Sequence, residues 1–203
     1  GAAAKVRRLS LRAASSGRLD VDSESLSLSA ILPFIYGLKQ LARHGWQVTA
    51  ADIADQALAR AAERAAASGV ADRVRWVQAD LSDWDPGAAY DLVTTHYAHP
   101  AMPQLEFYDR IASWVAPGGT LLIVGHLHHD HHGSHDHGHD HGAGADGEEP
   151  PASASVTAVD ITARLDPTVW EVVTAEESHR TMPGHGSGSA TLHDVVVRAI
   201  RRR

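Results

Sequence analysis

The pattern of apolar and polar residues between positions 38 and 126 switches repeatedly between two periods. Short runs that are apolar, or that alternate with polar residues, predict strands, and apolar residues three and four positions apart predict helices. Strands are predicted at 46–53, 72–81, 90–97 and 120–126, and helices at 38–45, 54–69 and 105–119. This alternation of strands and helices predicts a parallel sheet that helices cover on both faces.

The chain after residue 155 has a different pattern. It predicts a short helix at 158–166 and two strands at 168–178 and 190–203. About a dozen residues connect these strands, which suits an antiparallel pair at one side of the sheet. The N-terminal residues 1–19 are basic and lack acidic side chains. An organellar transit peptide has this composition, but we interpret the stretch as a surface arm.

The composition narrows the classes of protein. The chain has 203 residues, of which 43% are hydrophobic, and a net charge of −7, so we expect one globular domain that binds neither nucleic acid nor anionic membranes. It has no cysteine, which excludes disulfides and thiolate metal sites and fits a cytoplasmic location. No apolar run approaches the roughly 20 residues that cross a bilayer.

Two carboxylates stand where predicted strands end. Asp52 follows the run WQVTA, and Asp80 follows VRWVQA. In open α/β sheets, ligands bind beyond the carboxyl ends of the strands, where a carboxylate can accept hydrogen bonds from hydroxyl or amino groups. Aspartate is also a favoured N-cap, so each side chain could instead cap the helix or turn that follows it.

The segments 45–100 and 107–125 resemble the class I S-adenosylmethionine-dependent methyltransferases. Within that family they are most similar to the small bacterial group that includes the tellurite-resistance methyltransferases. The resemblance implies a Rossmann-like, doubly wound α/β domain over residues 1–203. Its sheet would have seven strands, of which one is antiparallel to the others. It also implies S-adenosylmethionine as the cofactor and a small molecule as the methyl acceptor.

The resemblance assigns a role to residues at three strand ends. Asp52 matches the acid that binds the cofactor ribose, and Ile53 lies beside the adenine. Asp80 matches the residue that contacts the adenine amine, and Leu81 packs on the ring. The run DLVTTHYAHP matches the fourth strand and its loop, so that Thr95 approaches the methionine moiety.

The resemblance also places His96 close to the methionine moiety of the cofactor. Methyl transfer from a sulfonium is a direct displacement, in which positioning can supply much of the acceleration. The catalytic residue is therefore unknown from the sequence, and His96, Tyr97 and His99 are the candidates for a general base. Each of them could equally be a loop residue that shapes the pocket.

The family's first strand ends in a glycine-rich turn, because glycine lets the backbone approach the cofactor closely. Counting back from residue 41 puts this turn near residues 31–35, within SLSAILPFIYG at 27–37. Ile31, Phe34 and Ile35 would obstruct the methionine end of the cofactor there. This placement predicts that the protein binds S-adenosylmethionine weakly or not at all.

The stretch 126–142, HLHHDHHGSHDHGHDHG, holds nine histidines and three aspartates. Its irregular spacing differs from the fixed ligand pairs of a catalytic zinc site, so we interpret 126–155 as an exposed insertion that binds divalent metal weakly. The best ligand candidates are His128, His129, His131, His135 and His137.

The sequence thus favours methyl transfer from S-adenosylmethionine to a small acceptor. One alternative is a metal-binding or metal-sensing protein that uses the histidine-rich insertion on a methyltransferase scaffold that no longer binds cofactor. Another alternative is a nucleotide-binding protein of the same fold without transfer chemistry. Cofactor titration with and without zinc or nickel distinguishes the three.

Overall fold

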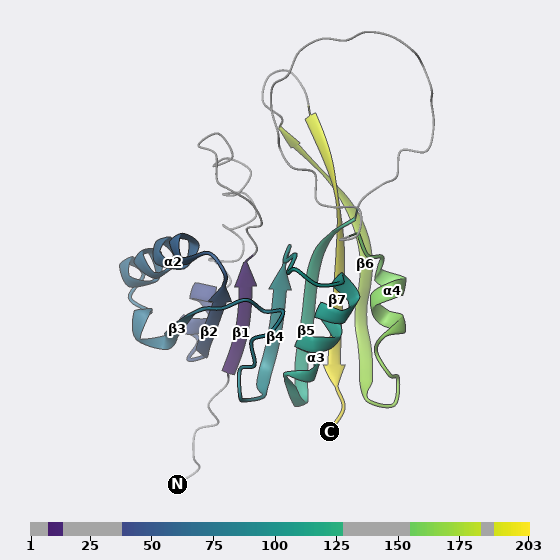
Figure 1. The fold of residues 1–203 in the computed structure, drawn as a ribbon, viewed down its shortest axis with the longest axis horizontal. Coiled ribbons are helices and arrows are strands. Elements are labelled where there is room, and N and C mark those ends of the chain that lie inside the picture. Colours follow the sequence, from purple (N-terminus) through teal and green to yellow (C-terminus); the bar gives the residue numbers. More distant parts are fainter. Residues whose placement is uncertain (1–7, 14–37, 128–154, 184–188) are drawn as a thin grey trace.

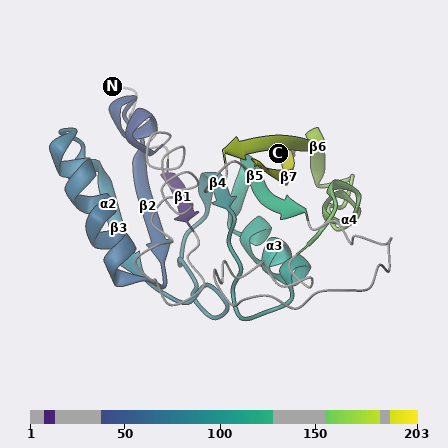
Figure 2. The same cartoon turned by 90° about the horizontal axis from the view of Figure 1, so that it is seen from above.

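The computed structural model describes residues 8–13, 38–127, 155–183 and 189–203, which form one sheet with helices on both faces (Figures 1 and 2). The strands are β1 (Arg8–Ala13), β2 (Gln47–Asp52), β3 (Val74–Gln78), β4 (Tyr90–His96), β5 (Val115–Leu127), β6 (Trp170–Pro183) and β7 (Ser189–Arg201). Residues 38–43 are helical, and the other helices are α2 (Asp55–Ala67), α3 (Gln104–Ser113), α4 (Ala158–Ala163) and the 3₁₀ turn η2 (Ala71–Arg73). In this part of the chain, no helix is both long and apolar enough to cross a membrane.

The sheet has the strand order β3-β2-β1-β4-β5-β7-β6. The pairs among β1 to β5 are parallel, and β7 is antiparallel to both of its neighbours, β5 and β6. A Rossmann-like, mostly parallel α/β fold, predicted from the alternation of elements, is therefore confirmed. The strand order reverses between β1 and β4, which is the switch point where such sheets bind ligands.

The N-terminal stretch contains the central strand, and its interpretation as a surface arm was wrong. Residues 8–13 pair in parallel with β2 on one side and with β4 on the other. The sequence RLSLRA does alternate leucine with polar residues, which is the period of a strand. Because β1 ends at Ala13, the chain leaves the sheet well before residues 31–35, where the turn was expected.

The prediction of an obstructed turn assumed that the first strand ended near residues 31–35, and this assumption was wrong. The residues that follow β1 read ASSGRLD, with a glycine at position 17. The stretch 27–37 on which the weak-binding prediction rested lies outside the described residues. Cofactor binding is therefore assessed from the residues at the strand ends that the structure describes.

Each face of the sheet has its own hydrophobic core. The side that carries α3 and α4 buries Phe107, Ile111, Leu121, Ile123 and Val197 among others. The other side, which carries α2 and the helix at 38–43, is built from smaller side chains. Its buried members are Leu38, Ala42, Val48, Ala50, Ala61, Ala65, Val70 and Val74. Small side chains let these helices approach the sheet closely, and Figure 2 shows the helices on opposite sides of it.

The element boundaries differ from the prediction most clearly in two regions. The helix predicted over 105–119 ends at Ser113, and β5 already begins at Val115, because Val115 pairs with Tyr90 and the Tyr90 amide donates to the Trp114 carbonyl at 2.8 Å. Gly119 makes this close approach feasible, since a Cβ there would lie 2.9 Å from the Tyr90 carbonyl oxygen. The strands β6 and β7 also extend toward each other further than predicted, so that only 184–188 connect them.

Candidate functional site

The carboxyl ends of four neighbouring strands lie at one edge of the sheet. In the β1–β4 pair, Ala13 is opposite His96, and in the β2–β3 pair, Asp52 is opposite Gln78. All four residues are the last of their strands. Asp52 and His96, two candidates from the sequence, thus lie at the edge of the sheet beside the β1–β4 switch point.

Asp52 is a buried carboxylate with a fixed orientation. Its side chain is 3% exposed, and its Oδ1 accepts a hydrogen bond from the Ala54 amide at 2.8 Å. The N-cap of α2 is Ala54 rather than Asp52, but the bond from the Ala54 amide means that the turn-capping alternative describes part of what Asp52 does. The neighbouring Ile53 is 46% exposed, which leaves an apolar surface next to the carboxylate.

Asp80 stabilises the turn that follows β3. Its Oδ1 accepts from the Ser82 amide at 2.9 Å and from the Ser82 hydroxyl at 2.8 Å. The turn-capping alternative therefore describes part of what Asp80 does. Leu81 is 2% exposed and packs in the core on the α3 side, so the role assigned to it beside the adenine stays a prediction.

Thr95 and His96 do not lie together, because neighbouring residues of a strand point to opposite faces of the sheet. Thr95 is 2% exposed, and among the described residues its Oγ1 has no hydrogen-bond partner. On the other face, His96 Nε2 lies 3.1 Å from the hydroxyl of Thr94. A buried hydroxyl that lacks a partner is unfavourable in the protein alone and is a ready partner for a ligand.

Burial lowers the pKa of His96 to about 4, since desolvation disfavours the imidazolium. His96 is therefore neutral at neutral pH and a poor acceptor of protons, because an effective general base has a pKa near the working pH. Of the three candidates for a base, His96 consequently fits a hydrogen-bonding role better than proton transfer. Tyr97 and His99 stay candidates.

The loop after β4 is held in an unusual conformation. Tyr97 has a φ of 52°, in the left-handed region that a large side chain rarely adopts, and its amide donates to the Val124 carbonyl at 2.8 Å. The Gln104 side chain, which is 4% exposed, donates to the carbonyl of Ala98 at 2.8 Å. These contacts position the loop that carries Tyr97 and His99 against the end of β5.

The same glutamine also contacts Tyr108, a residue that sequence reasoning missed. Burial raises the pKa of Tyr108 to about 12, against a smaller lowering by the Gln104 hydrogen bond. A Cβ on Gly125 would lie 2.9 Å from the Tyr108 hydroxyl oxygen, so the glycine admits this hydroxyl at the end of β5. The pairing of Gln104 with Tyr108 follows the helix spacing of four residues, which is the one signal that the sequence offered.

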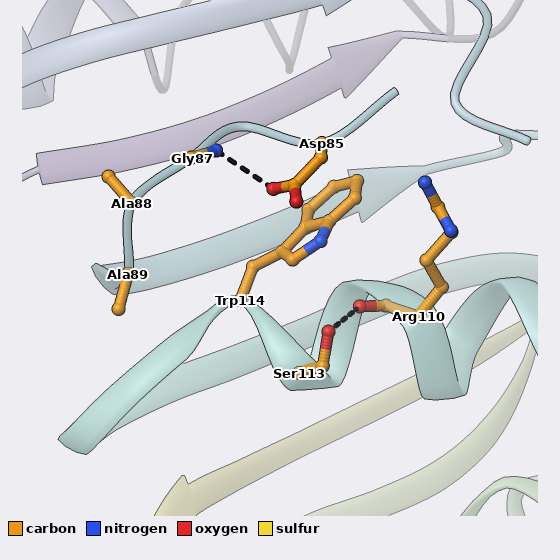
Figure 3. Close-up of a pocket in the computed structure, with 7 residues that line it drawn as sticks. All are labelled: Asp85, Gly87, Ala88, Ala89, Arg110, Ser113 and Trp114. Carbon is orange, nitrogen blue, oxygen red and sulfur yellow. Dashed lines mark hydrogen bonds between the residues drawn. The ribbon is translucent and has the colours of Figure 1, made fainter. Parts of the chain in front are cut away.

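Two pockets among the described residues lie elsewhere. One of about 390 Å³ is lined by Asp85, Gly87, Ala88, Ala89, Arg110, Ser113 and Trp114 (Figure 3). It opens at the amino ends of β4 and β5, opposite the edge that carries Asp52. The other, of about 480 Å³, lies between α4 and the start of β6. Neither contains a residue that the sequence singled out.

The histidine-rich stretch is not part of this site. The candidates His128, His129, His131, His135 and His137, and with them 128–154 of the insertion, lie outside the described residues. Within the described ranges, no three His, Cys, Asp or Glu side chains gather to hold a metal ion. The weak metal binding of the insertion stays a prediction.

Deleting 128–141 is expected to leave the melting temperature in EDTA nearly unchanged, because the run lacks the regular pattern of a packed element. Differential scanning calorimetry of the deletion variant and the intact chain measures this. A fall of several degrees, on the order of 1 kcal/mol or more for a domain of this size, would mean that the stretch is integral to the domain.

Comparison with known proteins agrees with this geometry. Residues 36–119 match a family model described as a methyltransferase domain. No curated protein matches the chain significantly in sequence. Among solved structures, NodS, an N-methyltransferase from Bradyrhizobium japonicum, has 15% identity and a TM-score of 0.54, with 98% of this chain and 86% of NodS covered.

Two further structures show the range of such proteins. TehB from Haemophilus influenzae has 14% identity and a TM-score of 0.56 over 80% of this chain and 52% of its own. The 16S rRNA (adenine(1408)-N(1))-methyltransferase from Catenulisporales acidiphilia has 17% identity and a TM-score of 0.54 over 97% and 88%. At these identities the likeness establishes the fold. The family match, over 36–119, agrees with the resemblance to methyltransferases that the sequence predicted.

Proposed function

We propose that this protein binds S-adenosylmethionine at the carboxyl ends of β1 to β4 and transfers its methyl group to a small-molecule acceptor. The observation that carries the proposal is the buried carboxylate of Asp52 at the end of β2, beside the switch point between β1 and β4. The methyltransferase-domain match over 36–119 covers β2, β3 and β4.

The described residues fit the chemical groups of this cofactor. Asp52 is a hydrogen-bond acceptor for the two ribose hydroxyls, and its orientation is fixed before binding by the Ala54 amide. The exposed side chain of Ile53 offers an apolar surface for the adenine ring. Asp80, whose Oδ1 is bound to Ser82, is a carboxylate that can accept a hydrogen bond from the adenine amine. The hydroxyl of Thr95 gains a partner at the methionine end.

When bound, the cofactor would supply a methyl group on a sulfonium. An electron-rich atom of the acceptor would attack that methyl carbon, and the neutral thioether S-adenosylhomocysteine would leave. The protein has no need of a covalent intermediate, and its task is to align the two reactants and exclude water. Tyr97 and His99 lie on the loop beyond β4, where they can orient the acceptor or take its proton. His96 stays neutral and orders that strand end through Thr94.

A small acceptor suits the charge of this chain better than a nucleic acid does. The net charge of −7 repels a polyanion, whereas binding to RNA phosphates requires clustered lysine and arginine. One structural relative is described as an N-methyltransferase and another as an rRNA methyltransferase, so the fold serves both classes. The acidic balance of this chain favours the first class.

Calorimetric titration with S-adenosylmethionine tests the proposal. The Thr95→Val variant tests whether the buried hydroxyl contacts the cofactor. This isosteric change removes the buried hydroxyl, so the melting temperature of the free protein should stay equal or rise. Cofactor affinity should fall about five- to tenfold, the equivalent of one net hydrogen bond of about 1 kcal/mol. The matched control is Thr94→Val on the opposite face, which should lower stability through the lost contact with His96 and change affinity less.

The titration also separates the alternatives. Absence of measurable heat with S-adenosylmethionine, together with binding of zinc or nickel, would contradict the proposal and favour a metal-binding scaffold. Binding without methyl transfer to any acceptor in a library of small amines, thiols and oxyanions would favour a nucleotide-binding protein. Equal affinities for the intact chain and Thr95→Val would remove Thr95 from the site.

A further inference from the structure

Two histidines face each other across the β6–β7 pair. His179 is the register partner of His193, and their ring centroids are 3.7 Å apart with the planes inclined by 42°. The strands are antiparallel, so directly opposite side chains lie on the same face and close together. His193 is half-buried and His179 is exposed. Solvent therefore reaches the His179 ring more readily than the His193 ring.

The pair lies at a defined place in the sheet. Leu127, the last residue of β5, pairs with His193, so the imidazoles stand where β5 ends and where β6 and β7 continue as a two-stranded ribbon (Figure 1). Because β6 runs in the same direction as β5, this ribbon projects past the edge that carries Asp52. The pair belongs to the same edge of the sheet as the candidate cofactor site, on strands at the other side of the switch point.

We propose that His179 and His193 form a cross-strand site for a divalent transition-metal ion, with water completing the coordination. Neutral imidazole nitrogens are good ligands for Cu²⁺, Ni²⁺ and Zn²⁺. Ring centres 3.7 Å apart bring the two imidazoles within reach of one shared ion, and the rings would rotate apart to direct one nitrogen each at it. A two-ligand site preassembled by the ladder loses less side-chain entropy than two histidines on a flexible segment.

The coordination number of this site follows from its neighbours. Glu177 lies two positions before His179 on the same face, but its Oε1 accepts a hydrogen bond from the Ala158 amide at 2.8 Å, at the start of α4. Consistent with this, the described residues contain no group of three ligands. A site with two protein ligands binds moderately, follows the order Mn²⁺ < Co²⁺ < Ni²⁺ < Cu²⁺, and weakens as the pH falls and the imidazoles become protonated.

The test must separate this pair from the other histidines of the chain. In a full-length background, the histidines at 128–141 and His185 are changed to glutamine, which leaves the pair in place. Titration of this chain with CuCl₂ and NiCl₂ should give a one-site isotherm, tighter for Cu²⁺. The Cu²⁺ electron paramagnetic resonance spectrum should show superhyperfine coupling to two nitrogens.

Three single changes in that background decide the proposal. His179→Gln and His193→Gln should each remove the one-site isotherm and one coupled nitrogen. The matched control His44→Gln, an exposed histidine beyond the helix at 38–43, should change neither. Circular dichroism melts in EDTA confirm that each variant is folded, and the exposed position of His179 makes its substitution the safer of the two.

Two results would overturn the assignment. One is a background chain that binds neither ion although it is folded. The other is a His179→Gln variant that keeps both the affinity and the two-nitrogen spectrum. Both readouts are independent of cofactor binding, so the metal site can fail while the proposed methyl transfer stands, and the reverse.

Discussion

Replacing Asp52 with alanine is expected to cause a large loss of affinity for S-adenosylmethionine in a protein that stays folded. In the proposed site, the substitution would remove the acceptor of the two ribose hydroxyls, which would then be desolvated without a partner. The loss of binding free energy is on the order of 1–3 kcal/mol, which raises the dissociation constant roughly five- to 150-fold. Stability should fall less, because the Oδ1 contact with the Ala54 amide joins residues only two positions apart in the chain.

The matched control is Asp55→Ala, which removes an exposed carboxylate from the first turn of α2. It lowers the negative charge by the same amount but leaves the strand end intact, so the cofactor affinity should be unchanged. Titration calorimetry gives the affinities, and urea unfolding gives the stabilities. Equal affinities for Asp52→Ala and the unmodified chain would take Asp52 out of the site.

The second large effect is a loss of stability in mild acid that depends on His96. In the unfolded chain this imidazole takes up a proton near pH 6.5, whereas in the folded protein burial lowers its pKa to about 4. Between these values the unfolded state binds more protons, so the free energy of unfolding decreases as the pH falls from about 6.5 to about 4. The contribution of His96 between pH 7 and pH 5 is about 2 kcal/mol.

Urea unfolding of the unmodified chain and of His96→Gln at pH 7 and pH 5 isolates this contribution. Glutamine keeps a hydrogen-bonding group near Thr94 but does not titrate, so the variant should lose less stability in acid. His44→Gln is the control, because His44 is exposed. If the unmodified chain and His96→Gln lost stability equally between the two pH values, burial of a neutral His96 would be refuted.

The sequence predicted the elements that have clear periods. The alanine-rich run that became α2 and the apolar run within β5 carry their patterns locally. The strand β2 ends at Asp52 as predicted, whereas β3 ends at Gln78, two residues before Asp80. The strand at 8–13 was missed, although it alternates leucine with polar residues. Its short, basic sequence resembles a surface arm, and only its pairing with β2 and β4 makes it the centre of the sheet.

What the sequence by itself determined is therefore the class of fold and the presence of acids at strand ends, because periodicity and turn position are properties of neighbouring residues. The tertiary structure decided which residues meet. It separated Thr95 from His96 by the strand's two faces, joined Gln104 to the Ala98 carbonyl, and set His179 against His193 through the β6–β7 register. These contacts depend on residues distant in the chain, whose pairing is set by packing and strand register rather than by local pattern.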